Sequence, residues 1–175
     1  MIKGAEELIR DFVITIRNRY SINVSEDEIV HEHLEAPHVP TNLPVGKAAV
    51  YVFSMPANSI VPAGPNRALK VGKAGPNSNA RFQYQHYKSG SANSTLAGAI
   101  ENNLVLQSYI GLDQTPRNVG SWIQKNIDRD NFFVDGLRKD LLSLLEVYLK
   151  GRLGPIFEGS LSTSGLTRGS SRRGK

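Results

Sequence analysis

The sequence predicts a mixed α/β (α+β) fold, in which helices flank a small, three-stranded, mainly antiparallel sheet and a helical extension precedes it. Two runs rich in β-branched and aromatic residues, at 48–55 and 68–72, are joined by a turn-rich loop and are expected to form an antiparallel hairpin. Helical patterns lie before and after these runs. The chain has 175 residues, 39% of them hydrophobic, which is enough for one domain with a substantial core.

Residues 1–46 are expected to form the helical extension and a linker. Apolar residues recur at helical spacing between residues 5 and 20, which predicts a first helix. Ser25 followed by Glu28 is a capping box and predicts a second, short helix that continues to about Glu35. A helix would separate His31 and His33 by about 200°. We therefore interpret "HEHLEAPH" as a solvated helix end rather than a metal site.

Residues 47–158 are expected to form the main domain. After the hairpin we expect helices from about 78 to 88, from 94 to 103 and from 122 to 127. The run "NFFVD" at 131–135 predicts a third strand. The strongest helical pattern, "LRKDLLSLLEVYLKGRL", follows and ends at Gly154-Pro155. Residues 159–175 are rich in Ser, Gly and Arg and predict a disordered basic tail.

Several classes of function are excluded by composition. Without cysteine, the chain has no disulfides, no zinc fingers and no thiol catalysis. The sequence shows no signal peptide and no run of about 20 apolar residues, so we expect a cytoplasmic protein without a membrane partner. Gly72-Lys73 does not complete a nucleotide-binding P-loop, because Arg67 and Ala74 stand where that motif needs a glycine and a hydroxyl residue. No nucleotide cofactor is therefore expected.

The distribution of charge favours a polyanionic partner. No Asp or Glu occurs between Glu35 and Glu101, and the chain as a whole carries a net charge of +5. Unopposed positive charge is attractive to phosphates, although two strands and a polar loop can also lack acids for no functional reason. The cationic residues of this acid-free window are Lys47, Arg67, Lys70, Lys73, Arg81 and Lys88.

Two charged residues stand at unusual places. Glu146 is the only charged residue between Asp140 and Lys150 and shares an apolar helical stripe. A carboxylate there needs a partner, which is either a cation such as Mg²⁺ or a basic side chain of the acid-free window. Lys70 interrupts an otherwise apolar strand.

Together these residues resemble the GIY-YIG nuclease superfamily, over roughly residues 48–158. The first element is "AVY", ending at Tyr51, and the second is "KVG", Lys70-Val71-Gly72, which is similar to a KIG-type variant of the superfamily. Arg81 lies on the predicted helix that follows, and Glu146 lies on the predicted later helix. Gln85 stands where the family usually has a histidine, and Glu158 stands where it usually has an asparagine.

The resemblance implies a DNA endonuclease that hydrolyses phosphodiester bonds with Mg²⁺ or Mn²⁺, in a restriction, mobile-element or phage-type role. Glu146 would hold the metal, Arg81 would stabilise charge on the phosphate, and Tyr51, helped by Lys70 or Lys73, would orient or deprotonate the attacking water. Either base would need a lowered pKa. There are two alternatives: a catalytically weak relative that binds nucleic acid without cutting it, and an unrelated module that binds an acidic partner. A homodimer is possible. The accessory candidates are Gln85, His86 and Glu158, and the DNA-binding candidates are Arg67, Lys88 and Ser94.

Overall fold

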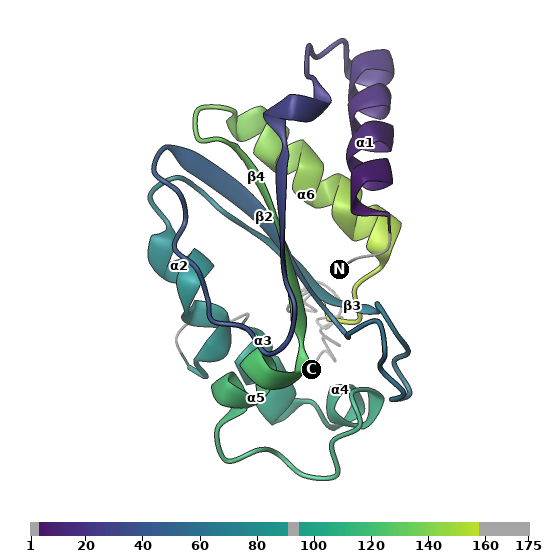
Figure 1. The fold of residues 1–175 in the computed structure, drawn as a ribbon, viewed down its shortest axis with the longest axis vertical. Helices are drawn as coiled ribbons and strands as arrows, with labels where there is room; N and C mark the ends of the chain where they lie inside the picture. The colour runs from purple at the N-terminus through teal and green to yellow at the C-terminus, as the bar shows by residue number, and fades with distance from the viewer. Residues whose placement is uncertain (1–3, 91–94, 158–175) are drawn as a thin grey trace, which may run out of the picture.

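The computed structural model describes residues 4–90 and 95–157 and shows one antiparallel sheet with helices on both faces (Figure 1). The sheet has four strands in the order β1-β4-β2-β3, which corrects the prediction of three. The predicted hairpin is confirmed, because β2 and β3 pair antiparallel. The strands are β1 (Val30–Leu34), β2 (Lys47–Ser54), β3 (Ala68–Ala74) and β4 (Asp128–Asp135).

Alternation along β2 directs its side chains into two separate cores. Val50 and Val52 point toward α1 (Ala5–Tyr20) and α6 (Lys139–Leu153), which lie side by side in Figure 1. Tyr51 points to the opposite face. That face is covered by short helices, which are α2 (Asn79–Gln83), η2 (Gln85–Tyr87), α3 (Leu96–Asn102), α4 (Leu104–Tyr109) and α5 (Val119–Asn126). The sheet therefore lies between one layer of long helices and one layer of short helices.

The second predicted helix is wrong for most of its length. The capping box of Ser25 and Glu28 is present, but it opens only a single 3-10 turn, η1 (Glu26–Glu28). The chain then becomes β1, which pairs with β4 along all five of its residues. Pairing with a central strand outweighs the local helical pattern here. Because residues two apart in a strand share a face, His31 and His33 lie on the same side of the sheet, and both contact Asp130 Oδ1, at 2.8 and 3.1 Å.

Other element boundaries also differ from the prediction. The helix expected to reach Lys88 ends at Gln83 and continues as the turn η2. Helix α4 was not predicted. Strand β4 begins at Asp128 rather than at 131. The prediction began too late because residues 128–131 are polar, although all four are buried in the structure. In the described part of the chain, no helix is long and apolar enough to cross a membrane.

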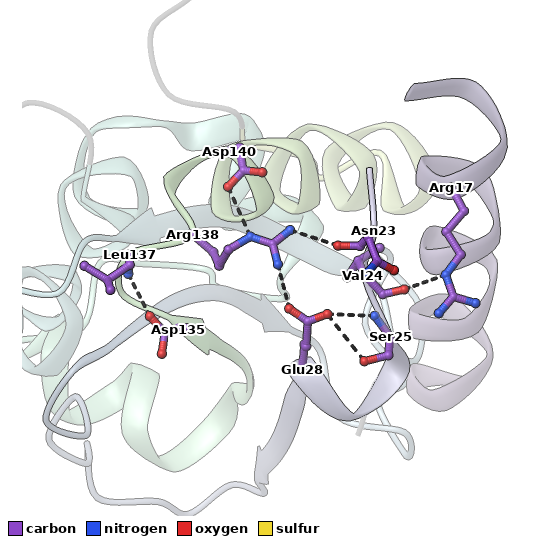
Figure 2. A network of polar contacts seen from close by, with 9 residues as sticks. All are labelled: Arg17, Asn23, Val24, Ser25, Glu28, Asp135, Leu137, Arg138 and Asp140. Atoms are coloured by element: carbon purple, nitrogen blue, oxygen red, sulfur yellow. Dashed lines mark hydrogen bonds and ion pairs between the residues drawn. The ribbon is translucent and has the colours of Figure 1, made fainter. Parts of the chain in front are cut away.

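The N-terminal segment is attached to the rest of the fold by a polar network that Figure 2 shows from close by. Arg138, just before α6, lies 2.6 Å from Glu28 Oε2 and also donates to Asn23 O at 3.4 Å. The same Glu28 accepts from the backbone N–H of Ser25 at 2.9 Å. Nearby, Arg17 Nε donates to Val24 O at 2.6 Å. The predicted domain boundary near residue 47 thus falls between two strands of one sheet.

Candidate active site

A cavity of about 430 Å³ opens between the β3–α2 loop and α6. Its volume lies within the range of ordinary ligand pockets. Three predicted site residues, Lys73, Arg81 and Glu146, line it, together with Lys139. Three cations around one carboxylate suit an anionic ligand such as a phosphate. The remaining lining residues are Gly75, Pro76, Ser78, Leu142 and Ser143.

Gly72 provides the space in which the ring of Tyr51 lies. The two residues are paired across β2 and β3, and both face the short-helix layer. A Cβ atom on Gly72 would lie 2.6 Å from Tyr51 Oη and 2.8 Å from two ring carbons. The absence of a side chain at position 72 therefore permits the phenol to lie across the edge strand. Contact with the Tyr51 ring thus explains why the third residue of "KVG" is a glycine in this structure.

The Tyr51 hydroxyl connects two side chains of the following segment. His86 Nε2 lies 2.6 Å from Tyr51 Oη, and Arg81 Nε donates to the same oxygen at 3.4 Å. The backbone N–H of Leu96 donates to His86 Nδ1 at 3.4 Å, which assigns the imidazole proton to Nε2. Burial, followed by the charges of nearby Lys70, Arg129 and Arg81, lowers the pKa of His86 to about 2. His86 is therefore a neutral donor that holds the Tyr51 oxygen in place.

The structure argues against Tyr51 as the base that deprotonates water. Its side chain is fully buried and does not line the cavity. Burial raises the pKa of its hydroxyl, and the hydrogen bond and charge of Arg81 offset this only in part. Neighbouring cations lower this pKa, but the loss of hydration outweighs their charge, so Tyr51 does not have the lowered pKa that such a base needs. Tyr51 instead fixes Arg81 at the wall of the cavity.

Glu146 is held by two lysines. Lys73 Nζ lies 3.0 Å from Oε2, and Lys150 Nζ lies 3.1 Å from Oε1. Lys73 also donates to Ser143 Oγ at 3.1 Å. Burial alone raises the pKa of Glu146, but the hydrogen bonds and charges of the two lysines outweigh it, so that the pKa is lowered. The carboxylate is therefore ionised at neutral pH, and the basic-partner alternative describes this structure.

Lys70 lies away from this cavity. It faces the short-helix layer, is buried, and its Nζ lies 4.6 Å from the centre of the Phe157 ring. It does not line the cavity, whereas Lys73 does. Phe157 is held in this position because its N–H donates to Leu69 O at 2.8 Å. Of the two predicted lysines, only Lys73 is placed to contact a phosphate in the cavity.

The other predicted site residues are dispersed. Arg67 lies just before β3, whereas the cavity adjoins the end of that strand. Lys88 Nζ stacks over the Tyr84 ring at 4.6 Å from its centre. Gln85 begins η2 and does not line the cavity. Ser94, Glu158 and the predicted tail at 159–175 lie outside the described residues.

Arg129 is a buried cation that the sequence reasoning did not identify. Its guanidinium lies 4.3 Å from the centre of the Phe82 ring and 5.4 Å from that of Tyr51. It donates to Asn131 Oδ1 and to Phe82 O, both at 2.8 Å. Arg129 stands in a run of polar residues, 128–131, which is typical of a loop, so the sequence did not indicate that it is buried. Lys150 was also missed, although its spacing of four residues from Glu146 is a recognisable signal.

The residues present could hold a divalent cation only together with a ligand. Within residues 4–90 and 95–157, no group of three or more His, Cys, Asp or Glu side chains is arranged to hold a metal ion. Mg²⁺, however, is often bound by one or two carboxylates together with water and substrate phosphate. Glu146 supplies one such carboxylate at the cavity wall. The donor set thus fits a cation shared with a phosphate.

No protein-family model, curated protein or solved structure matches this chain.

Proposed function

We propose that this protein is a DNA endonuclease of GIY-YIG type that hydrolyses phosphodiester bonds with a divalent cation. The observation that carries the proposal is the cavity that Lys73 and Arg81 line together with the partly buried carboxylate of Glu146. The acid-free window, which contributes both cations, supports a polyanionic substrate. The resemblance in the order of sequence elements supports the choice of DNA cleavage over other phosphate chemistry.

Each cavity residue has a role in this proposal. Arg81, fixed by Tyr51, donates to the scissile phosphate and stabilises the negative charge that develops on it. Lys73 donates to the phosphate or orients the attacking water. Glu146 would hold the divalent cation, Mg²⁺ or Mn²⁺, and the bound cation would supply Lewis-acid charge to the phosphate. His86 acts through Tyr51 and is a positioning residue.

One observation favours a second candidate, a nucleic-acid-binding protein that cuts weakly or not at all. Both carboxylate oxygens of Glu146 are occupied by ammonium groups in this structure. If these ion pairs persist when DNA binds, a metal must compete with two ammonium groups for the carboxylate oxygens. Such a protein would use the same cations to contact DNA backbone phosphates without hydrolysis.

Incubation with supercoiled and linear DNAs separates the two candidates. The wild-type protein is tested with Mg²⁺, with Mn²⁺ and with EDTA, and nicked and linear products are measured on gels. The endonuclease predicts products that require the metal. DNA binding that weakens steeply with salt, without products under any condition, would instead support the second candidate.

A further inference from the structure

The two lysines that hold Glu146 occupy the positions from which a cation would bind it. Lys73 and Lys150 approach different oxygens of the carboxylate, at 3.0 and 3.1 Å. The Glu146 side chain is only 14% exposed, so few other directions of approach remain. A divalent cation that binds Glu146 must therefore compete with these two ammonium groups for the carboxylate oxygens.

The surrounding charge opposes a cation in the absence of DNA. Lys73, Arg81 and Lys139 line the cavity with the single carboxylate Glu146, and Lys150 adds another positive charge beside it. A divalent cation that enters the cavity is repelled by these positive charges more strongly than it is attracted by the one carboxylate. A DNA phosphate changes both conditions, because it brings negative charge and also supplies oxygen ligands.

The two lysines differ in how firmly they are held. Lys73 projects from β3 and contacts both Glu146 and Ser143 Oγ, so that two residues of α6 fix it in the cavity. Lys150 lies one helical turn after Glu146 on the same helix and forms an i,i+4 pair with it. Such pairs contribute little to stability and exchange easily. Of the two lysines, Lys150 therefore has fewer contacts to lose if it moves away.

We propose that Lys150 makes cation uptake by Glu146 dependent on DNA: it occupies Oε1 in the free protein and moves to a DNA phosphate when the cation binds. This inference rests on the proposed function and adds to it an order of binding. DNA, or DNA with its counterions, must bind first, because only then does Lys150 leave the Glu146 carboxylate to the cation. Lys150 thereby acts as a further phosphate-contacting residue of the same site.

Titration with Mn²⁺ tests this order without any cleavage. Binding is measured by electron paramagnetic resonance of free Mn²⁺, first with protein alone. We expect weak binding by the wild type and binding at least about tenfold tighter by Lys150→Gln, which corresponds to about 1.4 kcal/mol. The gain must vanish in the double variant Lys150→Gln/Glu146→Gln, because Glu146 is the ligand that the substitution exposes.

Lys139→Gln is the matched control. It removes one positive charge from the wall of the same cavity, whereas the ion pairs of Glu146 are made by Lys73 and Lys150. A gain equal to that of Lys150→Gln would mean that net charge alone sets the affinity and would overturn the role of Lys150. Thermal unfolding of each variant confirms that the compared proteins are folded.

The second arm adds a short duplex with phosphorothioate linkages, and the Glu146→Gln variant supplies the background of Mn²⁺ bound by DNA itself. We expect the duplex to raise the affinity of the wild type toward that of Lys150→Gln. Two results overturn the inference: wild-type protein that binds Mn²⁺ without DNA as tightly as Lys150→Gln, or no Glu146-dependent binding in any variant even with DNA. Tight Mn²⁺ binding by the wild type without DNA would overturn only the role of Lys150, and the cleavage assay would still test the endonuclease proposal. Absence of cleavage by the wild type would count against the endonuclease proposal and not against the role of Lys150.

Discussion

The phenol ring of Tyr51 lies against the backbone of Gly72, where a Cβ atom would come within 2.6 Å of the Tyr51 hydroxyl oxygen. This hydroxyl accepts from Arg81, whose guanidinium belongs to the wall of the candidate active site. The contact between two neighbouring strands therefore determines where a cavity residue stands. We expect any displacement of the ring to be transmitted to the side chain of Arg81.

Gly72→Ala is accordingly expected to disturb both stability and catalysis. Forcing a methyl group against the buried ring should lower the free energy of unfolding by about 1–3 kcal/mol. Displacement of Arg81 by about 1 Å should reduce single-turnover cleavage about 10²-fold. Gly151→Ala is the control, because nothing lies within 4 Å of its added Cβ. Chemical denaturation and DNA cleavage measure the two effects, and a fully active Gly72→Ala would contradict the steric account.

Arg81→Lys should separate catalysis from binding. Lysine keeps the charge but cannot reproduce the planar guanidinium that contacts Tyr51. We expect single-turnover cleavage to fall about 10²–10³-fold. DNA affinity should change only a few-fold, because one phosphate contact among several is altered. Arg10→Lys, an exposed arginine of α1 that does not line the cavity, is the matched control and should cut normally. Equal losses in the two variants would contradict the assignment of Arg81.

Stability should fall between pH 6.5 and pH 4 because of buried histidines. Burial, followed by the charge of Arg129, lowers the pKa of His38 from 6.5 to about 4. The folded state thus favours the neutral imidazole, and its contribution is complete above pH 6.5 and is lost as the pH falls toward 4. The difference corresponds to roughly 3 kcal/mol for His38. His86, whose pKa is also lowered by burial, acts in the same direction.

Urea unfolding at pH 7.0, 5.5 and 4.5 measures this effect. His38→Gln keeps a polar group near the Tyr87 hydroxyl, which His38 contacts at 2.8 Å, but does not titrate. This variant should be less stable than wild type at neutral pH and should lose less stability on acidification. An unchanged slope between pH 6.5 and 4.5 in the variant would show that His38 does not carry the dependence.

Removal of residues 1–46 should abolish cooperative folding. The deletion takes away β1, which pairs with β4, and α1, whose Phe12 packs against Tyr148 at a ring distance of 5.2 Å. The central strand β4 would become an exposed edge carrying the buried Asp130. Circular dichroism during heating and amide proton dispersion are the measurements. A fragment 47–175 with a sharp transition and dispersed signals would show instead that the main domain folds independently.

The parts of the fold that were predictable are those with strong local patterns. The apolar period of α1, the β-rich runs of β2 and β3 and the pattern of α6 specified their elements. Strand β1 was missed because its capping signal is genuine but lasts for only one turn. The start of β4 was missed because its four polar residues are buried against partners from distant parts of the chain. Arg129, for example, bonds Phe82 O across 47 residues.

The same distinction applies to the site. The sequence suggested that Lys73, Arg81 and Glu146 act together, and in the structure all three line one cavity. It did not indicate that the Tyr51 hydroxyl contacts Arg81 and His86, because these contacts depend on the packing of α2 and η2 over the sheet. Nor did it distinguish Lys70 from Lys73. Strand alternation directs them to opposite faces, and only tertiary contacts identify which one meets Glu146.

The central claim is tested most directly by the cleavage rate of Glu146→Gln in the presence of Mg²⁺. This substitution keeps the size of the side chain and removes the charge that would hold the cation. Glu6→Gln, at the exposed first turn of α1, is the matched control. The assay uses enzyme in excess over supercoiled plasmid. The account predicts that Glu146→Gln remains folded and cuts at least about 10³-fold more slowly than the wild type and Glu6→Gln. Equal cleavage by Glu146→Gln and wild type would contradict it.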